Sequence, residues 1–498
     1  MKDLVEANFF GAVDADNDDL LLKSFENHRA FLSVINQERF LVLGKKGSGK
    51  TAIFKKLLDV VEHDFFCFGH TFSDYPWHYH DLQARVGIPD FDKFTHSWKY
   101  LILVTVSKML LNYDNSLPYD DESLEHLGRI ERFIVDSYGS RDPDVTQLFT
   151  PTKKLKLKPS FEIDTKLLKL GVSPEQVPVT DLPVIVQEVN ANLMRSVIGS
   201  MNPEHRYVIC FDQLDLGFDP NDANYVNRLI GLILACRDIN IASRQAGKRF
   251  FVSVLLRDDI YDELRFEDKN KITENFVSLI EWDTPRVPST LKELMENRFT
   301  SVLSDNDGDK VTWDEVFNED REMPGHQTKY QHILDHTYQR PRDMIKFCNL
   351  VLDSFKGRVG QNNAADHSKK IDNIDVHNSK QAYSDYFARE LDDEIHKHLP
   401  NYADFLGAIR AIGLWQFTSD EFIKYCEERK IAEGADISGI LASLYNFSII
   451  GFYRPGGKGY GGSEYVFRYK EPRTGFDPTA TRFRAHSGLI DHLGLKRK

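Results

Sequence analysis

The eight residues Gly44 to Thr51, which read Gly-Lys-Lys-Gly-Ser-Gly-Lys-Thr, constrain the fold of this chain more than any other segment. They match the pattern G-x-x-x-x-G-K-[ST] and follow an apolar run at 39–43. Residues 51–58 carry apolar side chains at helical spacing and contain no Gly or Pro. A glycine-rich turn between a strand and a helix presents backbone N–H groups and a helix N-terminus to phosphate oxygens. The segment therefore predicts a nucleoside-triphosphate site.

Each residue of this loop has an expected role at such a site. Lys50 would supply positive charge to the terminal phosphates, and the Thr51 hydroxyl would ligate Mg²⁺. The remaining residues would line the phosphates through their backbone: Gly44, Lys45, Lys46, Gly47, Ser48 and Gly49. We therefore expect ATP and Mg²⁺ as cofactors, although the sequence does not decide between ATP and GTP.

Composition limits the class of protein. With 498 residues, 41% hydrophobic and 28% charged, the chain is long enough for two to four domains. Its longest apolar stretches, 229–236 and 250–256, are far shorter than the roughly 20 residues that span a bilayer, and the first residues have no signal-peptide pattern. Five scattered cysteines without C-x-x-C spacing argue against a disulfide framework and a zinc site. We expect a cytoplasmic protein that contacts no membrane.

Several short apolar runs end in polar residues, as buried parallel strands do. They lie at 39–44, 206–211, 249–256 and 276–280, and an aromatic, strand-like run lies at 65–72. Between the aromatic run at 65–72 and the apolar run at 206–211, three segments have helical patterning. They lie around 91–112, 119–138 and 181–201. The expected fold is α/β: a P-loop NTPase parallel sheet in a core over residues 1–285, with a helical insertion at about 75–200.

Two further domains are expected after this core. A helix starts at Pro341 in a helical lid and linker over residues 286–395, in which the polar stretch with Gly357 and the run 360–369 is the candidate mobile link. The last part, 396–498, has the order of a winged-helix domain, three helices and then a hairpin with a glycine-rich tip. The expected helices are 402–414, 419–429 and 437–446, and the expected strands are 448–454 and 465–469.

Acidic residues follow the predicted strand at 206–211. Asp212 has the position of a Walker B aspartate, which would hold Mg²⁺ together with Thr51. Gln213 follows it, where many hydrolysing P-loop ATPases place a glutamate, and an amide cannot accept a proton at neutral pH. Asp215 is then the candidate base, although it could equally cap a helix or solvate a loop. The sequence thus leaves the rate of hydrolysis open.

Two arginines are candidates for contact with the phosphates. Arg257 ends the strand at 249–256, where a sensor of the γ-phosphate is expected, and the alternative is an ion pair with Asp258 or Asp259. Arg340 and Arg342 flank Pro341 at the helix start, and Arg342 is the better candidate to reach a phosphate. A structural pair with Asp343 is the alternative for these two.

The C-terminal region is basic within an acidic chain. Residues 451–498 contain ten Lys or Arg and four Asp or Glu, a local charge of +6 in a chain of net charge −13. Duplex DNA is therefore a candidate partner for the predicted winged helix. The candidate contacts are Arg454, Lys458, Arg468 and Lys470. The expected recognition helix at 437–446 contains no Lys or Arg, so base reading by that helix is not expected, and a protein-interaction or lid-locking role is the alternative.

The order of these motifs resembles the prokaryotic AAA-like and STAND-like P-loop ATPases, which include KAP-type proteins and relatives from bacterial and phage defence loci, and it is also similar to archaeal-type replication initiators. The resemblance covers nearly the whole chain except the insertion. It implies that Lys50 and Thr51 bind phosphate and Mg²⁺, Asp212 is the Walker B acid, Arg257 occupies the sensor-1 position and Arg342 is a sensor-2-like lid residue. Gln213 departs from the pattern and puts efficient hydrolysis in doubt.

The leading hypothesis is an AAA-like ATPase that couples its nucleotide state to DNA or to a partner protein in antiviral defence or genome maintenance. The alternative is a STAND-like switch or scaffold, in which ATP orders a homo-oligomer that controls an effector protein without binding DNA. A small-molecule kinase is disfavoured because no acceptor site is recognisable. The sequence does not give the oligomeric state, the effector or the role of the insertion.

Overall fold

The structure is a computed structural model. It describes residues 2–71, 90–143, 182–215, 218–219, 222–284, 289–306, 309–361, 369–396, 398–399, 401–431, 436–456 and 462–497. Lys458, a candidate DNA contact, and much of the predicted insertion lie outside these residues. The chain divides into two compact units. The sheet unit comprises Asn27–Lys45 and Lys50–Ile280, and the helical unit comprises Met1–Glu26, Lys46–Gly49 and Glu281–Lys498.

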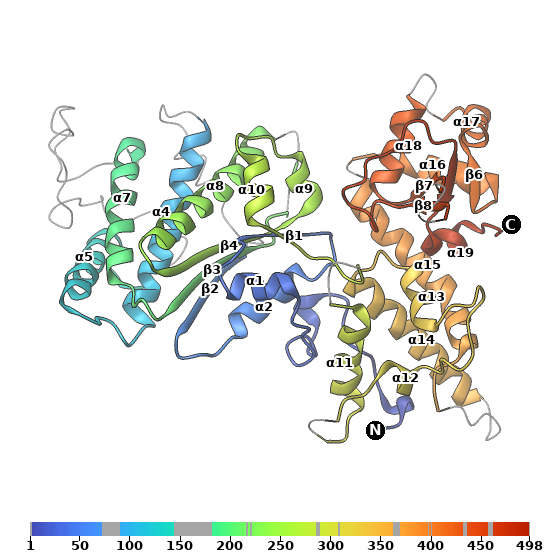
Figure 1. Ribbon diagram of the computed structural model, residues 1–498, viewed down its shortest axis with the longest axis horizontal. Coiled ribbons are helices and arrows are strands. Elements are labelled where there is room, and N and C mark those ends of the chain that lie inside the picture. Colours follow the sequence, from blue (N-terminus) through green and yellow to red (C-terminus); the bar gives the residue numbers. More distant parts are fainter. Residues whose placement is uncertain are drawn as a thin grey trace. The chain divides into compact units, whose positions relative to one another are not determined.

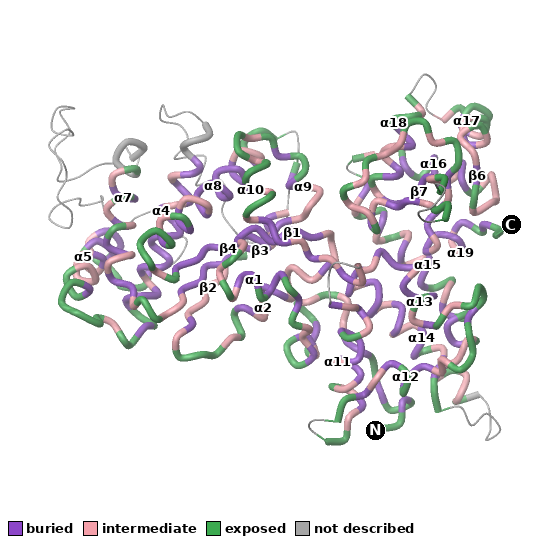
Figure 2. The backbone as a smooth tube through the Cα atoms, in the orientation of Figure 1, coloured by how far each residue is buried: buried purple, intermediate pink, exposed green. Residues whose placement is uncertain are grey.

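The sheet unit contains a five-stranded parallel sheet in the order β2-β3-β4-β1-β5 (Figure 1). The strands are β1 Leu41–Gly44, β2 Phe65–Thr71, β3 Arg206–Asp212, β4 Arg249–Arg257 and β5 Val277–Leu279. Central strands of a covered parallel sheet are buried on both faces, which explains their continuous apolar sequences. In β1, β3 and β4 nearly every residue is buried (Figure 2). The mixed α/β class and the parallel strands predicted from these runs are confirmed.

The helices of this unit pack on the sheet or on one another. They are α1 Arg29–Ile35, α2 Lys50–Asp59, α4 Asp90–Asn112, α5 Asp121–Tyr138, α7 Leu182–Ser200, α8 Ala223–Gln245, α9 Asp258–Glu263 and α10 Lys269–Phe276. Helices α5 and α7 contact each other and α4. Helix α8 begins after the N-cap Asp222 and is apolar on most of its surface. At Gly231 an added Cβ would lie 2.6 Å from the Phe94 Cβ, so glycine permits α4 and α8 to approach closely.

The helical unit begins with two short turns and continues with helices from residue 291 onward. They are η1 Leu4–Glu6, η2 Ala15–Asn17, α11 Leu291–Leu303, α12 Trp313–Val316, α13 Lys329–Asp335, α14 Pro341–Gln361 and α15 Asn373–Ile395. Helices α14 and α15 pack along each other, and Phe347 stacks on Tyr383 with ring centroids 4.2 Å apart. A buried ion pair, Arg298 to Asp18 at 2.7 Å, fastens the first residues to α11.

The last hundred residues form a second, antiparallel sheet with helices. The helices are α16 Tyr402–Ile412, α17 Ser419–Glu428, α18 Ile437–Asn446, η5 Ser487–Leu489 and α19 Ile490–Leu493. The strands are β6 Gln416–Thr418, β7 Ile450–Arg454, β8 Glu464–Val466 and β9 Arg482–Ala485, in the order β6-β9-β7-β8. The three predicted helices and the two predicted hairpin strands are present, and β6 and β9 are additions to them.

One prediction from the polar composition is contradicted at the start of its range. Gly357 and Gly360 do not begin a mobile link, because both lie inside α14, which continues to Gln361. The packing of α14 on α15 outweighs the low helix propensity of two glycines. Residues 362–368 lie outside the described residues. The domain boundaries expected at about 285 and 395 stay predictions.

Two expectations about the whole chain can be compared with the described residues. No helix in this part of the chain is long and apolar enough to cross a membrane. All five cysteines are free, including Cys67 and Cys210, which lie on neighbouring strands.

Candidate nucleotide-binding site

The loop 44–51 connects β1 to α2, as predicted. Gly47 has φ +77° and Gly49 has φ +109°, a left-handed backbone that residues other than glycine adopt only with strain. The Trp282 indole donates a hydrogen bond of 3.0 Å to the Ser48 carbonyl oxygen. By its contacts the central part of the loop, Lys46–Gly49, belongs to the helical unit, and its flanking residues belong to the sheet unit.

Within the sheet unit, Lys50 is folded against its own loop. Its Nζ donates to the carbonyl oxygens of Gly44 at 2.8 Å and Lys45 at 2.9 Å. Burial lowers the pKa of the Lys50 ammonium, and the carboxylates of Asp215, Asp212 and Asp258 oppose that shift. Both printed hydrogen bonds of this ammonium go to neutral carbonyl oxygens, and a phosphate oxygen in their place would form a stronger, charge-assisted hydrogen bond.

Asp212 ends β3, and its side chain is buried with 1% exposure. Burial raises the pKa of its carboxyl to about 6, and hydrogen bonds from the Thr51 side chain and the Gln213 backbone oppose the rise. One carboxylate oxygen, Oδ2, has no hydrogen-bond partner among the described residues. Buried polar atoms are nearly always paired, and a carboxylate oxygen is a ligand that Mg²⁺ accepts. The two residues predicted to hold the metal are thus adjacent.

The described residues contain no group of three or more His, Cys, Asp or Glu side chains that could hold a metal by itself. Mg²⁺ usually keeps several waters and is held by one or two protein ligands together with substrate phosphates. Thr51 and Asp212 therefore fit a cation that arrives with a polyphosphate.

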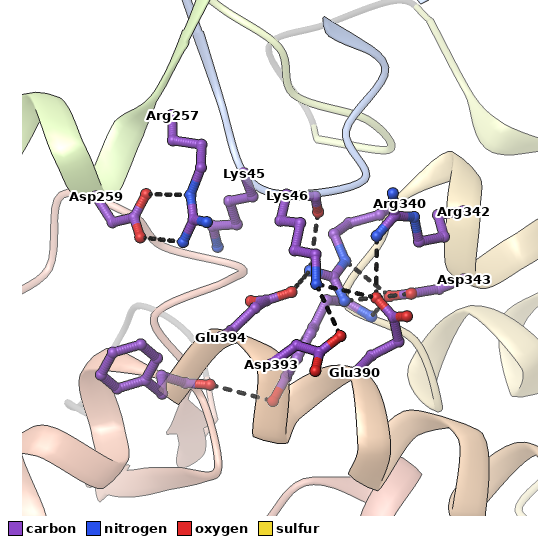
Figure 3. Close-up of polar contacts among 12 residues, drawn as sticks. Lys45, Lys46, Arg257, Asp259, Arg340, Arg342, Asp343, Glu390, Asp393 and Glu394 are labelled. Atoms are coloured by element: carbon purple, nitrogen blue, oxygen red, sulfur yellow. Dashed lines mark hydrogen bonds and ion pairs between the residues drawn. The ribbon is translucent and has the colours of Figure 1, made fainter. Parts of the chain in front are cut away.

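Arg257 ends β4 and makes two hydrogen bonds to the Asp259 carboxylate, from Nε at 3.0 Å and from Nη2 at 2.5 Å (Figure 3). Its Nη1 lies 3.7 Å from Oδ2 of Asp215. The ion pair considered as the alternative to the sensor role is therefore present. Because Asp215 is near the same guanidinium, the structure brings together the predicted base and the predicted sensor.

The residue that follows Asp212 has an unusual backbone conformation. Gln213 has φ +59°, in the left-handed region that is uncommon outside glycine. Such strained positions cluster at functional sites. Gln213 stood out in the sequence for its side chain, whereas its backbone conformation leaves no signal there.

Within the helical unit, Arg340 anchors the loop. Its Nη1 donates to the Lys46 carbonyl oxygen at 2.9 Å and to Glu394 at 2.7 Å, and its Nε donates to Asp343 at 2.9 Å (Figure 3). Arg340 is 3% exposed and Asp343 is fully buried. The structural pair with Asp343 therefore belongs to Arg340, which leaves Arg342 with a different partner.

Arg342 contacts the loop at Gly47. A Cβ added at Gly47 would lie 3.0 Å from the Arg342 Cβ and 3.3 Å from its Nε, and the Arg342 backbone N–H approaches the Gly47 carbonyl at 3.4 Å. The Arg342 guanidinium pairs with Glu390 of α15 at 3.0 Å (Figure 3). Glu390 also lies 3.7 Å from Nζ of Lys46, and Asp393 lies 3.4 Å from the same atom.

Three acidic residues of α15, Glu390, Asp393 and Glu394, thus contact the loop lysine and the two arginines of the Arg-Pro-Arg segment. These carboxylates were not predicted from the sequence. The acidic run at 390–394 was visible, but only the packing of α15 on α14 brings it to Arg340 and Arg342.

The basic residues predicted to contact DNA are mostly engaged within the chain. Arg454 pairs with Glu464 at 2.6 Å and Glu471 at 2.9 Å, and Lys470 pairs with Asp335 at 3.2 Å. Arg468 donates to the Thr474 carbonyl at 3.2 Å. These partners reduce the charge that Arg454 and Lys470 can offer to a phosphate backbone.

Two comparisons with known proteins bear on this site. Residues 289–392 match the family model of the FunZ-associated C-terminal helical domain, a segment that includes Arg340, Arg342 and Glu390 and excludes the loop 44–51. Over 479 residues the chain is 24% identical to the "Putative transposon gamma-delta 80.3 kDa protein" of Escherichia coli strain K12. It is a distant homologue of that protein. The match covers 90% of this chain and 62% of the relative's length.

Proposed function

We propose that this protein binds ATP with Mg²⁺ at the loop Gly44–Thr51 and is a slowly hydrolysing ATPase of the AAA-like P-loop class. The observation that carries the proposal is the buried Asp212 carboxylate, which has one oxygen without a partner among the described residues and receives a hydrogen bond from Thr51. In this proposal the parallel sheet is a P-loop NTPase sheet, and the C-terminal helices and strands form a winged helix.

The strand order supports this role for the sheet. β1 pairs with β4, and β4 pairs with β3, so the loop, Arg257 and Asp212 all follow the carboxyl ends of parallel strands. Open α/β sheets bind their ligands at this edge. Lys50 and the helix α2 N-terminus would hold the phosphates, and Thr51 with Asp212 would hold the metal.

Bound Mg²⁺ and ATP would supply a γ-phosphate whose loss on hydrolysis removes negative charge from the loop. The residues of this chain determine how fast that loss occurs. Gln213 cannot act as a base at neutral pH, and Asp215 is the candidate, with its carboxylate 3.7 Å from the Arg257 guanidinium. We therefore infer slow turnover, with Asp215 as base and Arg257 as the sensor of the γ-phosphate.

This assignment predicts the behaviour of one conservative variant. Asp215→Asn should abolish the residual hydrolysis and leave ATP binding intact, because the amide keeps the shape and loses the basicity of the carboxylate. Steady-state phosphate release and equilibrium ATP binding measure the two properties separately. Unchanged turnover would place the base elsewhere.

The nucleotide state would be coupled to DNA or to a partner protein. The homologous transposon protein favours a role with mobile DNA or genome maintenance over other cytoplasmic roles, and antiviral defence stays within the proposal. The alternative is a STAND-like switch, in which ATP orders a homo-oligomer that controls an effector. The pairing of Arg342 and Lys46 with α15 carboxylates favours the switch, because these contacts would change when phosphate competes for the same cations.

ATPase measurements with and without DNA distinguish the two. Stimulation by DNA that falls steeply with added salt supports coupling to DNA. A rate that is insensitive to DNA at low salt, together with ATP-dependent oligomers in light scattering, supports the switch. Absence of ATP binding rules out both.

A further inference from the structure

One face of the C-terminal sheet alternates arginine with aromatic side chains. In β9, Arg482 and Arg484 are on the opposite face from the buried Phe483. The register places Arg484 beside Gln416 of β6 and Gly451 of β7, and it pairs Tyr453 of β7 with Tyr465 of β8. We call this the arginine–aromatic face, and its members are Trp415, Tyr453, Tyr465, Arg482, Arg484 and Arg497.

The arginines of this face lie over the rings. The Arg484 guanidinium carbon is 3.9 Å from the Tyr465 centroid and 4.4 Å from the Trp415 centroid. Arg497 lies over Trp415 at 4.8 Å, and Arg482 lies over Tyr453 at 5.7 Å. The Trp415 indole is itself fixed by a hydrogen bond of 2.7 Å to the Ala485 carbonyl. The result is one continuous set of cations and rings from β7, β8 and β9, extended by Trp415 and Arg497.

These arginines differ from the other C-terminal cations in their charge partners. Among the described residues, no carboxylate forms a salt bridge with Arg482, Arg484 or Arg497, whereas Arg454 pairs with two glutamates. The Nε of Arg484 is buried and has no hydrogen-bond partner in the described part of the chain, so a ligand would meet the terminal nitrogens of this guanidinium. Asp335 is the carboxylate whose charge acts on Arg484, and it already pairs with Lys470. The face therefore has positive charge that the fold leaves uncompensated.

Stacking determines what such arginines can bind. A ring against the flat side of a guanidinium leaves the N–H groups at its edge free, and these groups match the oxygens of a phosphate in a bidentate geometry. The rings also hold each arginine in one orientation, which lowers the entropy lost on binding. Half-buried tyrosine and tryptophan rings in a basic surface are the combination that proteins use to stack unpaired bases.

We propose that the arginine–aromatic face binds single-stranded nucleic acid, with Arg482, Arg484 and Arg497 on the phosphates and Tyr453 and Tyr465 beside the bases. Unpaired bases are required because a duplex keeps its base faces stacked inside. An acidic peptide would use the arginines and leave the rings without a function. Binding of nucleic acid to this face does not depend on the proposed ATPase function. Only its biological role rests on that function, in which nucleic acid would be the partner coupled to the nucleotide state.

Fluorescence anisotropy of the full chain with a labelled 20-nucleotide oligothymidine, without ATP, tests the proposal. The wild type should bind at 50 mM salt, and Arg482→Ala with Arg484→Ala should weaken binding at least about 10-fold. The logarithmic salt slope should fall by about 0.7 for each phosphate that the variant no longer neutralises. Arg473→Ala removes an exposed arginine of the same unit outside this face and should stay within twofold of the wild type.

Further variants and ligands distinguish loss of the binding site from loss of the fold and from binding of other ligands. Arg484→Lys keeps the charge but loses the planar fork, and it should weaken binding several-fold with an unchanged near-UV spectrum. Lys50→Ala should bind the oligonucleotide as the wild type does, so failure of the ATP site does not affect this result. The proposal is overturned by absence of binding at 50 mM salt, tighter binding of a matched duplex, equal binding of polyglutamate, or full binding by the double variant.

Discussion

Arg340 and Lys46 are joined by a hydrogen bond of 2.9 Å, from the guanidinium Nη1 to the backbone carbonyl of the loop. The arginine is in turn held by Asp343 and Glu394, so a buried network fixes the position of the loop backbone. Arg340 is therefore a positioning residue, and Arg342, with a half-buried guanidinium beside Gly47, is the better candidate for phosphate contact.

Loss of the Arg340 side chain should destabilise the protein. Arg340→Ala leaves the Asp343 carboxylate buried without its partner, which typically costs about 3–5 kcal/mol in the free energy of unfolding. Urea denaturation measures this loss. Adding Asp343→Asn should recover part of it, because no ionised carboxylate then stays buried. An Arg340→Ala variant as stable as the wild type would show that the network is unimportant.

Glu390 should compete with ATP. Its carboxylate binds Arg342 at 3.0 Å and lies 3.7 Å from Lys46, so it occupies cations that phosphates would use. Glu390→Gln should tighten ATP binding by roughly 1 kcal/mol, about fivefold, since the pair is partly exposed and screened. Asp385→Asn, a matched change on α15 beside His492, should leave affinity unchanged. Weaker binding by Glu390→Gln would mean instead that Glu390 orients Arg342 for the phosphate.

Replacement by alanine should be harmful at Gly47 and stabilising at Gly357. Gly47 has φ +77° and approaches Arg342, so Gly47→Ala strains the loop and should lower ATP affinity at least about 10-fold.

Gly357 lies in an exposed position of α14 with no atom within 4 Å of an added Cβ. Gly357→Ala should stabilise the protein by about 0.5–1 kcal/mol in chemical denaturation. Destabilisation at Gly357 would contradict a helix that continues through this position.

Acid should destabilise the helical unit. Burial lowers the pKa of His336 to about 3 and that of His332 to about 2, and burial also lowers the pKa of His486. Below the unfolded pKa of about 6.5 the unfolded chain gains protons that the folded chain does not, so stability falls as pH decreases. The expected slope is up to about 1.4 kcal/mol per pH unit for each histidine. Urea midpoints at pH 7.5 and 5.5 test this, and His336→Phe should show a shallower slope. A midpoint that does not fall on acidification would contradict these pKa values.

The sheet was predictable because its sequence signal is local. β3 and β4 are buried on both faces, so their residues form continuous apolar runs, and the loop at 44–51 fixes which run is β1. The polar residues at the strand ends followed from the same pattern. Physical contact between Thr51 and Asp212 was therefore expected from chain order alone.

The contacts between α14 and α15 were not predictable in this way. Helix α15 places its buried residues, such as Tyr383, Phe387 and Leu391, among many charged ones, so its apolar spacing is a weak signal. The pairing of Arg342 with Glu390 spans 48 residues and depends on tertiary packing. Strand β9 has only four residues, Arg482–Ala485, too few for an alternating pattern to stand out.

Equilibrium binding of ATP with Mg²⁺ to the full chain, measured by isothermal titration calorimetry, tests the nucleotide site most directly. The wild type should bind one ATP per chain, and Lys50→Ala should bind at least about 10-fold more weakly, because a charge-assisted hydrogen bond contributes roughly 1.5–3 kcal/mol. Asp212→Asn should lose the part of the affinity that depends on Mg²⁺. No binding by a folded wild type, or equal affinity in Lys50→Ala, would contradict the account.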